Sequence, residues 1–300
     1  MMIEFPIHIV GSGAVGSLIT AKAIQQNIEA IQIVRHSSLT NSVVVLDNES
    51  IALTNKTLIS HVSQIEFLVV PVKAFDVEPV LTSIKPLLKY GAQVVITHNG
   101  LGTLELSKRL IGDIADIYFC TTSTGAYTDG NTVIQAGKGQ SQWSLISLCP
   151  YKTKTRAIVN QIVNALFYDA SYVENLNVVL WNKLAVNSVI NPITAIENIN
   201  NGDVLKSQYN ELIDNVLFEL FMVANKSGIS LSLQQLKENV INVATNTKNN
   251  SSSMRQDILA HRKTEIDFIN GYIVELAKQY EIDVPTNSYL VEKVKELVLL

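Results

Sequence analysis

Three glycines near the start of the chain follow the apolar run 7–10 with the spacing G-x-G-x-x-G. The first permits a tight turn after a strand, the second lets a ligand approach the backbone, and the third lets a helix pack closely on the strand. The helix that opens there directs its free N–H groups and positive dipole end at the turn, which suits phosphate. The sequence therefore predicts a dinucleotide pyrophosphate site at Gly11, Ser12, Gly13, Ala14, Val15 and Gly16.

Arg35 follows the predicted strand 30–34, at the position where NAD-binding proteins usually carry an acidic residue for the ribose 2′-hydroxyl. No Asp or Glu occurs in the ten residues after it. A guanidinium suits a 2′-phosphate, so the sequence favours NADP over NAD. The alternative is a solvated arginine with no ligand.

Two more polar residues follow apolar runs that read as strands. Lys73 comes after 67–72, and Asn99 comes after 94–97 with glycines close behind it. Ligands of open α/β sheets bind beyond the carboxyl ends of the strands, so these residues are expected at the same edge as Gly11 and Arg35. Lys73 would meet a phosphate and Asn99 a ribose or substrate oxygen. A solvated loop lysine and a turn asparagine are the alternatives.

A second group of polar residues recurs at four-residue spacing: Lys183, Asn187 and Asn191. On a helix they lie within roughly 80° of one another. The neighbouring positions are mostly apolar, and a polar stripe on a buried helix needs partners, which a polar ligand would supply. A narrow solvated stripe is the alternative. Pro192 is expected to end or kink this helix near Asn191.

Ser253 and Glu265 lie in a third polar segment. Ser253 with Gln256 fits a helix capping box, and Glu265 in an apolar context would often pair with Arg262. One continuous helix over 253–265 would separate Ser253 from Glu265 by about 18 Å. Either the helix breaks near 261–263, or only one of the two residues touches a small substrate.

The elements that must position these residues divide the chain into two parts. In residues 1–173, short β-branched runs alternate with helical patterns, which predicts a Rossmann-type doubly wound α/β sheet. The runs from 117 to 148 contain turn glycines and are expected to add antiparallel hairpins to that sheet. In residues 174–300, apolar residues recur at helical spacing and predict an all-α domain with helices at 174–191, 203–227, 232–248, 263–280 and 286–299.

Composition excludes several classes of protein. The chain has 300 residues, 47% hydrophobic and 17% charged, with a net charge of −4. That balance is typical of a globular protein and argues against nucleic acid as a partner. No apolar run is long enough for a membrane span, no signal peptide is evident, and a cytoplasmic location is expected. The two cysteines are expected to be buried and reduced, and the scattered histidines suggest no metal site.

Several of these motifs together resemble the ketopantoate reductase family over nearly the whole chain. The matching residues are the N-terminal G-S-G-A-V-G, 98–102 (H-N-G-L-G), 183–187 (K-L-A-V-N), 191–195 (N-P-I-T-A), 252–257 (S-S-M-R-Q-D), 264–267 (T-E-I-D) and 270–271 (N-G). The resemblance implies NADPH-dependent reduction of 2-dehydropantoate (ketopantoate) to pantoate in pantothenate biosynthesis. It implies a small keto acid as substrate. The sequence leaves open whether the protein is a monomer or a homodimer.

The resemblance also implies roles for particular residues. Lys183 would be the general acid, and Glu265 would orient it and contact substrate or cofactor. Asn99 would lie between cofactor and substrate. The remaining substrate-binding residues would be Asn187, Asn191, Asn201 and Ser253, and the remaining cofactor-binding residues Arg35, Lys73 and the backbone near Ala126.

Two other functions fit the same motifs. One is a related NAD(P)-dependent reductase of another small 2-keto or 3-hydroxy acid. The other is a cofactor-binding sensor without turnover, against which the presence of Lys183 and Glu265 argues.

Overall fold

The computed structural model describes residues 3, 5–35, 43–150 and 156–298. The chain divides into two compact units. The first, here called the sheet unit, comprises residues 1–98 and 103–176. The second, the helical unit, comprises residues 177–300 together with the short segment 99–102.

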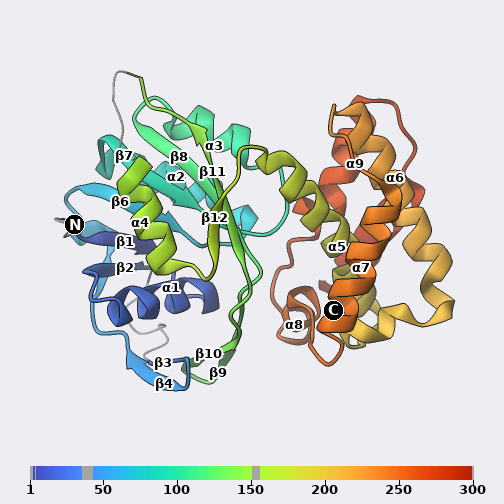
Figure 1. The fold of residues 1–300 in the computed structure, drawn as a ribbon, viewed down its shortest axis with the longest axis horizontal. Helices are drawn as coiled ribbons and strands as arrows, with labels where there is room; N and C mark the ends of the chain where they lie inside the picture. The colour runs from blue at the N-terminus through green and yellow to red at the C-terminus, as the bar shows by residue number, and fades with distance from the viewer. Residues whose placement is uncertain (1–2, 4, 36–42, 151–155, 299–300) are drawn as a thin grey trace. The chain divides into compact units, whose positions relative to one another are not determined.

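The sheet unit is built on an eight-stranded sheet of order β12-β11-β8-β7-β6-β1-β2-β5 (Figure 1). From β5 to β8 all neighbouring strands are parallel, and the order reverses between β1 and β6. This is the doubly wound order of dinucleotide-binding domains, and it confirms the predicted fold class. The strands are β1 (Ile7–Val10), β2 (Ala30–Val34), β5 (Lys56–Leu58), β6 (Ile65–Val70), β7 (Leu88–Ile96), β8 (Ala115–Thr122), β11 (Ser141–Ser147) and β12 (Ala170–Tyr172).

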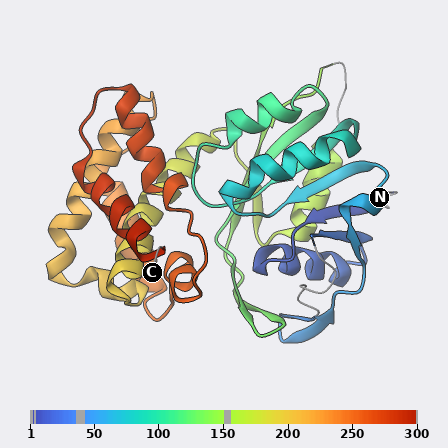
Figure 2. The ribbon, with the colours of Figure 1, turned by 180° about the vertical axis from the view of Figure 1, so that it is seen from behind.

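Helices cover both faces of this sheet. Helices α1 (Ala14–Gln25) and α4 (Arg156–Leu166) lie on one face, and α2 (Val77–Ile84) and α3 (Leu104–Ile111) on the other (Figures 1 and 2). Ile9 and Val69 of the central strands are fully buried against Ile19 of α1 and Ile162 of α4. The central strands are therefore buried along most of their length, without the alternation of exposed and buried positions, as expected for parallel strands covered on both sides.

The prediction for residues 117–148 is wrong in part. β8 pairs in parallel with β7, and β11 is antiparallel to β8 as expected. The β9–β10 hairpin, however, leaves the main sheet and joins a separate four-stranded sheet of order β4-β3-β10-β9. The apolar face of this second sheet, with Val44 and Val133, covers Leu18 and Ala21 of α1. The strands are β3 (Val43–Leu46), β4 (Glu49–Ala52), β9 (Gly125–Asp129) and β10 (Thr132–Gly137).

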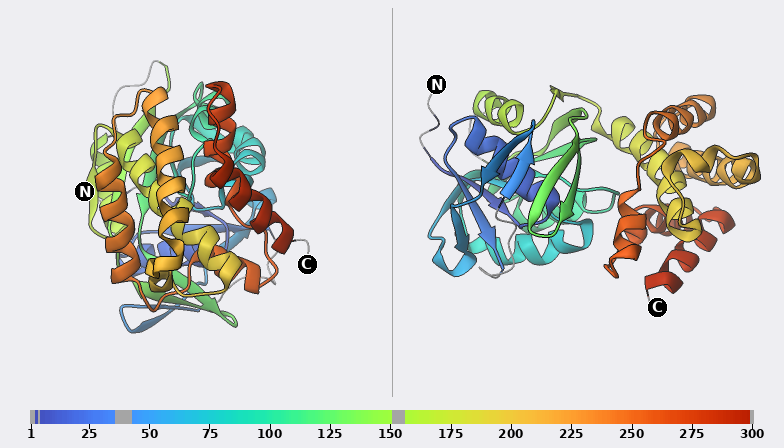
Figure 3. Two further views of the ribbon diagram at one scale, coloured as in Figure 1. Left: turned by 90° about the vertical axis from the view of Figure 1, so that its right-hand side faces the viewer. Right: turned by 90° about the horizontal axis from the view of Figure 1, so that it is seen from below.

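The helical unit confirms the predicted all-α second part. Its helices are α5 (Leu176–Glu197), α6 (Asn210–Lys226), α7 (Leu233–Asn246), α8 (Ser253–Leu259), α9 (Asn270–Gln279) and α10 (Pro285–Val298). Helix α10 packs against α9 and α6, and α6 packs against α7 (Figure 3). The segments predicted at 203–227 and 263–280 begin with short 3₁₀ helices instead: η4 (Asn201–Leu205), η5 (Ser207–Tyr209) and η6 (Ile266–Phe268).

Two local predictions in this unit need correction. Of the two outcomes expected at Pro192, an end or a kink of the helix near Asn191, the end is wrong: helix α5 continues through Pro192 to Glu197. The residues beyond the proline, Ile193 and Ala195 among them, are buried, and their packing outweighs the hydrogen bond that proline removes.

The segment 253–265 breaks where expected. Helix α8 ends at Leu259, and His261 adopts a left-handed conformation with φ 51°. The expected cap is one residue off: Ser252, not Ser253, accepts the hydrogen bond from the Arg255 N–H, so the Ser253 capping box is wrong. Three consecutive serines leave this register ambiguous in the sequence.

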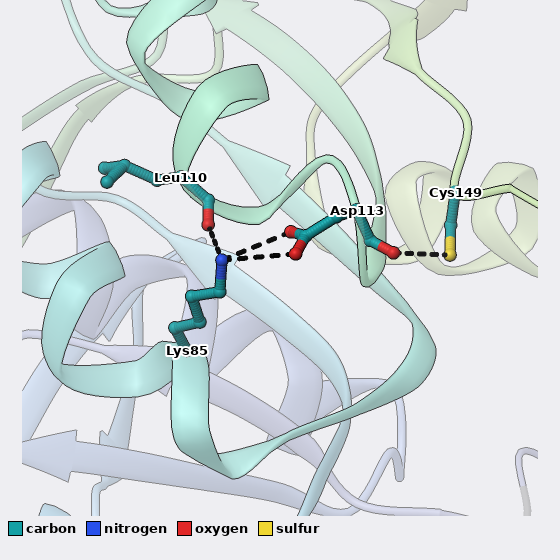
Figure 4. Close-up of polar contacts among 4 residues, drawn as sticks. All are labelled: Lys85, Leu110, Asp113 and Cys149. Carbon is teal, nitrogen blue, oxygen red and sulfur yellow. Dashed lines mark hydrogen bonds and ion pairs between the residues drawn. The ribbon is translucent and has the colours of Figure 1, made fainter.

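Both cysteines are buried and free, as predicted. The Cys149 thiol faces the Asp113 carbonyl at 3.5 Å, and Lys85 binds the same turn through the Leu110 carbonyl and the Asp113 carboxylate (Figure 4). In the described parts of the chain, no helix has the length and apolar character to cross a membrane. Nor does any cluster of His, Cys, Asp and Glu in those parts have the arrangement to hold a metal ion.

Candidate active site

The glycine turn after β1 has a conformation that other residues avoid. Gly11 has φ 95°, its N–H donates to the Ile33 carbonyl at 2.9 Å, and its own carbonyl accepts from the Gln32 side chain at 3.0 Å. A Cβ on Gly16 would lie 2.6 Å from the Gly11 carbonyl oxygen. Gly11 therefore makes the turn, and Gly16 lets α1 approach it.

Gly13 has a different role. It is the N-cap of α1, no side chain caps the helix there, and a Cβ at this position would meet nothing within 4 Å. The first backbone N–H groups of the helix are those of Ala14 and Val15, which follow Ser12 and Gly13. They lie next to open space, which a side chain at position 13 would partly fill. This arrangement fits a pyrophosphate, since backbone N–H groups and the helix dipole favour an anion.

Arg35 directly follows β2, and its guanidinium forms an ion pair of 2.8 Å with Asp76, which precedes α2. The Arg35 side chain is 72% exposed and the Asp76 side chain 31%. Exposed ion pairs of this kind contribute little free energy. The guanidinium is thus held at the carboxyl edge of the sheet and remains accessible to a second anion.

Lys73 and Ala126 also belong to the sheet unit. Lys73 follows β6 and places its ammonium 5.9 Å from the centre of the Phe75 ring. Ala126, in β9, packs against the cluster that covers α1, so its side chain has a packing role. Its backbone as part of a cofactor site stays a prediction.

Helix α5 carries Lys183, Asn187 and Asn191 along one stripe, and their exposure falls along the helix. Lys183 and Asn187 are half-buried, whereas Asn191 is 7% exposed. Apolar neighbours such as Leu184 and Ile190 are buried. The polar stripe therefore runs from a half-exposed part of α5 into a buried part at Asn191, where a side-chain amide needs a polar partner that a ligand could supply.

Glu265 begins the segment that leads into α9. It is 8% exposed and is the residue before η6. Arg262, the salt-bridge partner that the sequence offered for Glu265, pairs instead with Asp257 at 3.1 Å. A buried carboxylate on this segment is in keeping with a role in binding or catalysis.

The segment 99–102 packs on the same part of the helical unit. The Leu101 N–H donates to the Phe268 carbonyl at 2.8 Å. Gly100 has φ 81°, and a Cβ there would lie 2.3 Å from the same carbonyl oxygen. The half-buried Asn99 is thus placed by a close backbone approach, which only glycine at the next position permits.

Gly102 lies against the ring of Tyr272, which also packs edge-on against Trp181 with ring centroids 6.0 Å apart. Burial raises the pKa of Tyr272, so its hydroxyl stays neutral at ordinary pH. Because Trp181 is two residues before Lys183, this contact links the start of α9 to the lysine-bearing part of α5.

Asn201 and Ser253 lie on neighbouring elements of the helical unit. Asn201 donates from its side chain to Thr247 at 3.0 Å, and Arg255 of α8 donates to Asn198 and Asn200 just before it. Ser253 is exposed at the start of α8. These contacts fix the segment of Asn201 beside α8.

One hydrogen-bond acceptor of Asn201, its side-chain oxygen, is not used among the described residues. Its Oδ1 is buried with no hydrogen-bond partner among the described residues, and the same holds for the Ser251 hydroxyl. Buried polar atoms normally have partners. A polyhydroxylated or carboxylate ligand nearby would provide them, which fits Asn201 as a substrate residue.

The structure also identifies supporting residues that sequence analysis missed. The Thr194 and Ser252 hydroxyls lie 2.7 Å apart, and this contact ties the end of α5 to the start of α8, next to Ser253. Asp76 was not expected beside Arg35. Both contacts join residues far apart in the chain, and nothing in the local pattern signals them.

Comparison with known proteins decides the family. The family model described as "Ketopantoate reductase PanE/ApbA" matches residues 7–147, and its C-terminal counterpart matches residues 175–298. The chain belongs to the ketopantoate reductase family. It is 31% identical to a 2-dehydropantoate 2-reductase of Yersinia pestis, covering 96% of this chain and 94% of the relative. It is 30% identical to that of Vibrio cholerae, covering 97% of each.

Solved structures share the fold over nearly the whole length. A ketopantoate reductase of this family from Ralstonia eutropha superposes with a TM-score of 0.87 at 22% identity, covering 98% of each chain. A D-mandelate dehydrogenase with NADH and anilino(oxo)acetate superposes with a TM-score of 0.86 at 23% identity and the same coverage. These structures show the shared fold, and the family match makes the protein an oxidoreductase of the ketopantoate reductase family.

Proposed function

We propose that this protein reduces 2-dehydropantoate to pantoate with NADPH, in the biosynthesis of pantothenate. The observation that carries the proposal is the stripe of Lys183, Asn187 and Asn191 on helix α5, of which Asn191 is buried, in a chain of the ketopantoate reductase family. A lysine and two amides on one face supply the proton donor and the hydrogen-bonding groups that a small hydroxylated keto acid requires.

The cofactor would be held by residues of the sheet unit. The N–H groups at the start of α1, opened by Gly13, would bind the pyrophosphate. Arg35 and Lys73 would bind the phosphate at the adenosine end. When bound, the reduced nicotinamide supplies the hydride that converts the ketone carbon to a secondary alcohol.

Lys183 would act as general acid. Hydride addition builds negative charge on the carbonyl oxygen, and an ammonium that hydrogen-bonds this oxygen stabilises the transition state more than the ground state. The ammonium then gives its proton to the oxygen, so the product is a neutral hydroxyl. Glu265 would orient the ammonium, and Asn99 would steady the neighbouring cofactor and substrate groups.

The remaining polar residues would bind the substrate. Asn187 and Asn191 can each donate and accept a hydrogen bond, and Ser253 presents an exposed hydroxyl. The Asn201 Oδ1 would accept from the substrate hydroxyl and so gain the partner that it lacks among the described residues. Such groups distinguish a hydroxylated keto acid from an apolar one, because an unpaired buried amide is costly.

A second substrate class has an observation in its favour. The D-mandelate dehydrogenase, whose structure holds NADH, shares the fold at a TM-score of 0.86. An enzyme of that kind would reduce phenylglyoxylate, the keto acid of mandelate, and would use NADH. The two amides of Asn187 and Asn191 on α5 and the Arg35 guanidinium after β2 support ketopantoate and NADPH instead.

The experiment is a comparison of kcat/KM for ketopantoate and phenylglyoxylate, each with NADPH and with NADH. We expect ketopantoate with NADPH to give the highest value. A higher value for phenylglyoxylate would refute the substrate, and equal values for the two cofactors would refute the NADP preference.

Two further properties accompany the proposal. We propose a cytoplasmic location, to be checked by cell fractionation. We propose a monomer or a homodimer, to be checked by sedimentation. A structural neighbour from Staphylococcus aureus is described as a dimeric ketopantoate reductase, with a TM-score of 0.79 at 19% identity and coverage of 98% and 99% of the two chains.

A further inference from the structure

Pro192 leaves one carbonyl of α5 without its usual donor. In an α-helix each backbone N–H donates to the carbonyl four residues earlier, and proline has no N–H. The carbonyl concerned is that of Ser188, which lies directly after Asn187 on the polar stripe. Ser188 is fully buried, so water does not replace the missing donor.

The side chain of Asn270 supplies the donor instead. Its Nδ2 lies 2.9 Å from the Ser188 carbonyl oxygen and 3.0 Å from the Asn287 Oδ1. The two amide protons can therefore each serve one acceptor. The side chain is fully buried, and its own Oδ1 has no partner within the described ranges, so donation accounts for the position of this amide.

The far end of this arrangement is held by a buried carboxylate. Glu219 of α6 accepts from the Asn287 N–H at 2.9 Å, from the Asn287 side chain at 2.7 Å and from the Thr286 N–H at 2.8 Å. A carboxylate at the start of α10 is also favoured by the helix dipole. The hydrogen bond to the Ser188 carbonyl is thus the last in a series of hydrogen bonds that joins α6, α10, α9 and α5.

The position of Asn270 connects this series of hydrogen bonds to the proposed active site. Asn270 is the first residue of α9, directly after the segment that holds Glu265 and that binds residues 99–102 through the Phe268 carbonyl. We infer that Asn270 is a positioning residue, which replaces the helical hydrogen bond lost at Pro192 and so sets the Glu265 segment against the helix of Lys183. The inference rests on the proposed function of Lys183 and Glu265.

A double-mutant cycle tests the inference, because Pro192→Ala restores a backbone donor for the Ser188 carbonyl. We expect Asn270→Ala to lower kcat by about tenfold or more, with the KM for NADPH changed by less than about twofold. In the Pro192→Ala background we expect the same substitution to cost at least about threefold less. Each kcat is divided by the NADPH-binding sites titrated in that sample, so that misfolded protein does not count.

Asn287→Ala is the matched control, since it removes an amide of the same series of hydrogen bonds but leaves Asn270 able to donate to Ser188. Its effect on kcat should be the same in both Pro192 backgrounds. If Asn270→Ala does not fold, Asn270→Leu, which has a similar volume and no donor proton, takes its place.

Turnover is measured with whichever of ketopantoate and phenylglyoxylate the wild type reduces faster, so a wrong substrate and a wrong positioning residue give different results. A wild type that does not reduce ketopantoate refutes the proposed function alone. An Asn270→Ala enzyme with wild-type kcat, or an equal loss in both Pro192 backgrounds, overturns the inference.

Discussion

The proposed preference for NADPH depends on one exposed guanidinium, that of Arg35, and the expected size of the preference can be worked out. A hydrogen bond to a charged group is worth about 1.5–3 kcal/mol, and the 72% exposure of the Arg35 side chain places its bond to a 2′-phosphate near the lower end. Since about 1.4 kcal/mol corresponds to a tenfold change, Arg35→Ala should raise the Kd for NADPH by about 10- to 30-fold. The Kd for NADH should not change, because NADH has no 2′-phosphate.

Asp76 provides a test with the opposite sign. Its carboxylate pairs with Arg35 and would repel a phosphate at the same guanidinium. Exposed ion pairs are worth about 0.2–1 kcal/mol, so Asp76→Asn should lower the Kd for NADPH by about 1.4- to 5-fold. Added salt should shrink both effects by screening.

The assay is a fluorescence titration of NADPH and of NADH into wild type, Arg35→Ala and Asp76→Asn. Arg109→Ala, which removes an exposed arginine of α3, is the matched control and should bind both cofactors as the wild type does. An Arg35→Ala variant that loses the same affinity for NADPH and NADH, or none for either, would refute the assignment of Arg35 to the 2′-phosphate.

Three further predictions concern the glycine turns and a buried histidine. Gly13→Ala should leave the free energy of unfolding within about 1 kcal/mol of wild type but weaken NADPH binding at least about tenfold. Gly16→Ala places a Cβ 2.6 Å from the Gly11 carbonyl oxygen and should lower the free energy of unfolding by about 1–3 kcal/mol. Urea unfolding and NADPH titration distinguish the two variants, and equal effects of both would contradict the separate roles of the two glycines. Gly100→Ala combines φ 81° with a backbone clash and should cost at least about 2 kcal/mol and most of kcat; a stable, active variant would contradict the placement of this segment. Burial, opposed in part by Glu29, lowers the pKa of His8, so the neutral His8 contributes stability above about pH 6.5, and this contribution is lost as the pH falls. Below about pH 6.5, the unfolding free energy of His8→Leu should therefore change less steeply with pH than that of wild type. An unchanged slope would contradict this prediction.

The features that the sequence predicts well are those set by neighbouring residues. The strand, turn and helix at 7–25 are local, and the positive φ of Gly11 follows from the turn itself. The doubly wound sheet and the helical second part follow from the periodicity of apolar residues, which burial imposes over long segments. The break after α8 is one of the two outcomes that the distance between Ser253 and Glu265 left open.

The features that it predicts poorly depend on contacts between distant residues. The β9–β10 hairpin leaves the main sheet because its apolar face covers Leu18 and Ala21 of α1, and an alternating strand does not name its partner. The helix beyond Pro192 persists through tertiary packing, while proline alone predicts an end or a kink. The donor that Asn270 brings to the Ser188 carbonyl comes from another helix and has no local signature.

The central claim is that Lys183 delivers the proton in an NADPH-dependent reduction of ketopantoate. The most direct measurement is the loss of nicotinamide absorbance at saturating NADPH and ketopantoate, for wild type, Lys183→Ala and the control Lys278→Ala, which removes an exposed lysine of α9. We predict rapid oxidation by wild type and control, and a loss in kcat of about a hundredfold or more in Lys183→Ala with NADPH binding intact. A Lys183→Ala enzyme that keeps the wild-type rate would contradict the account.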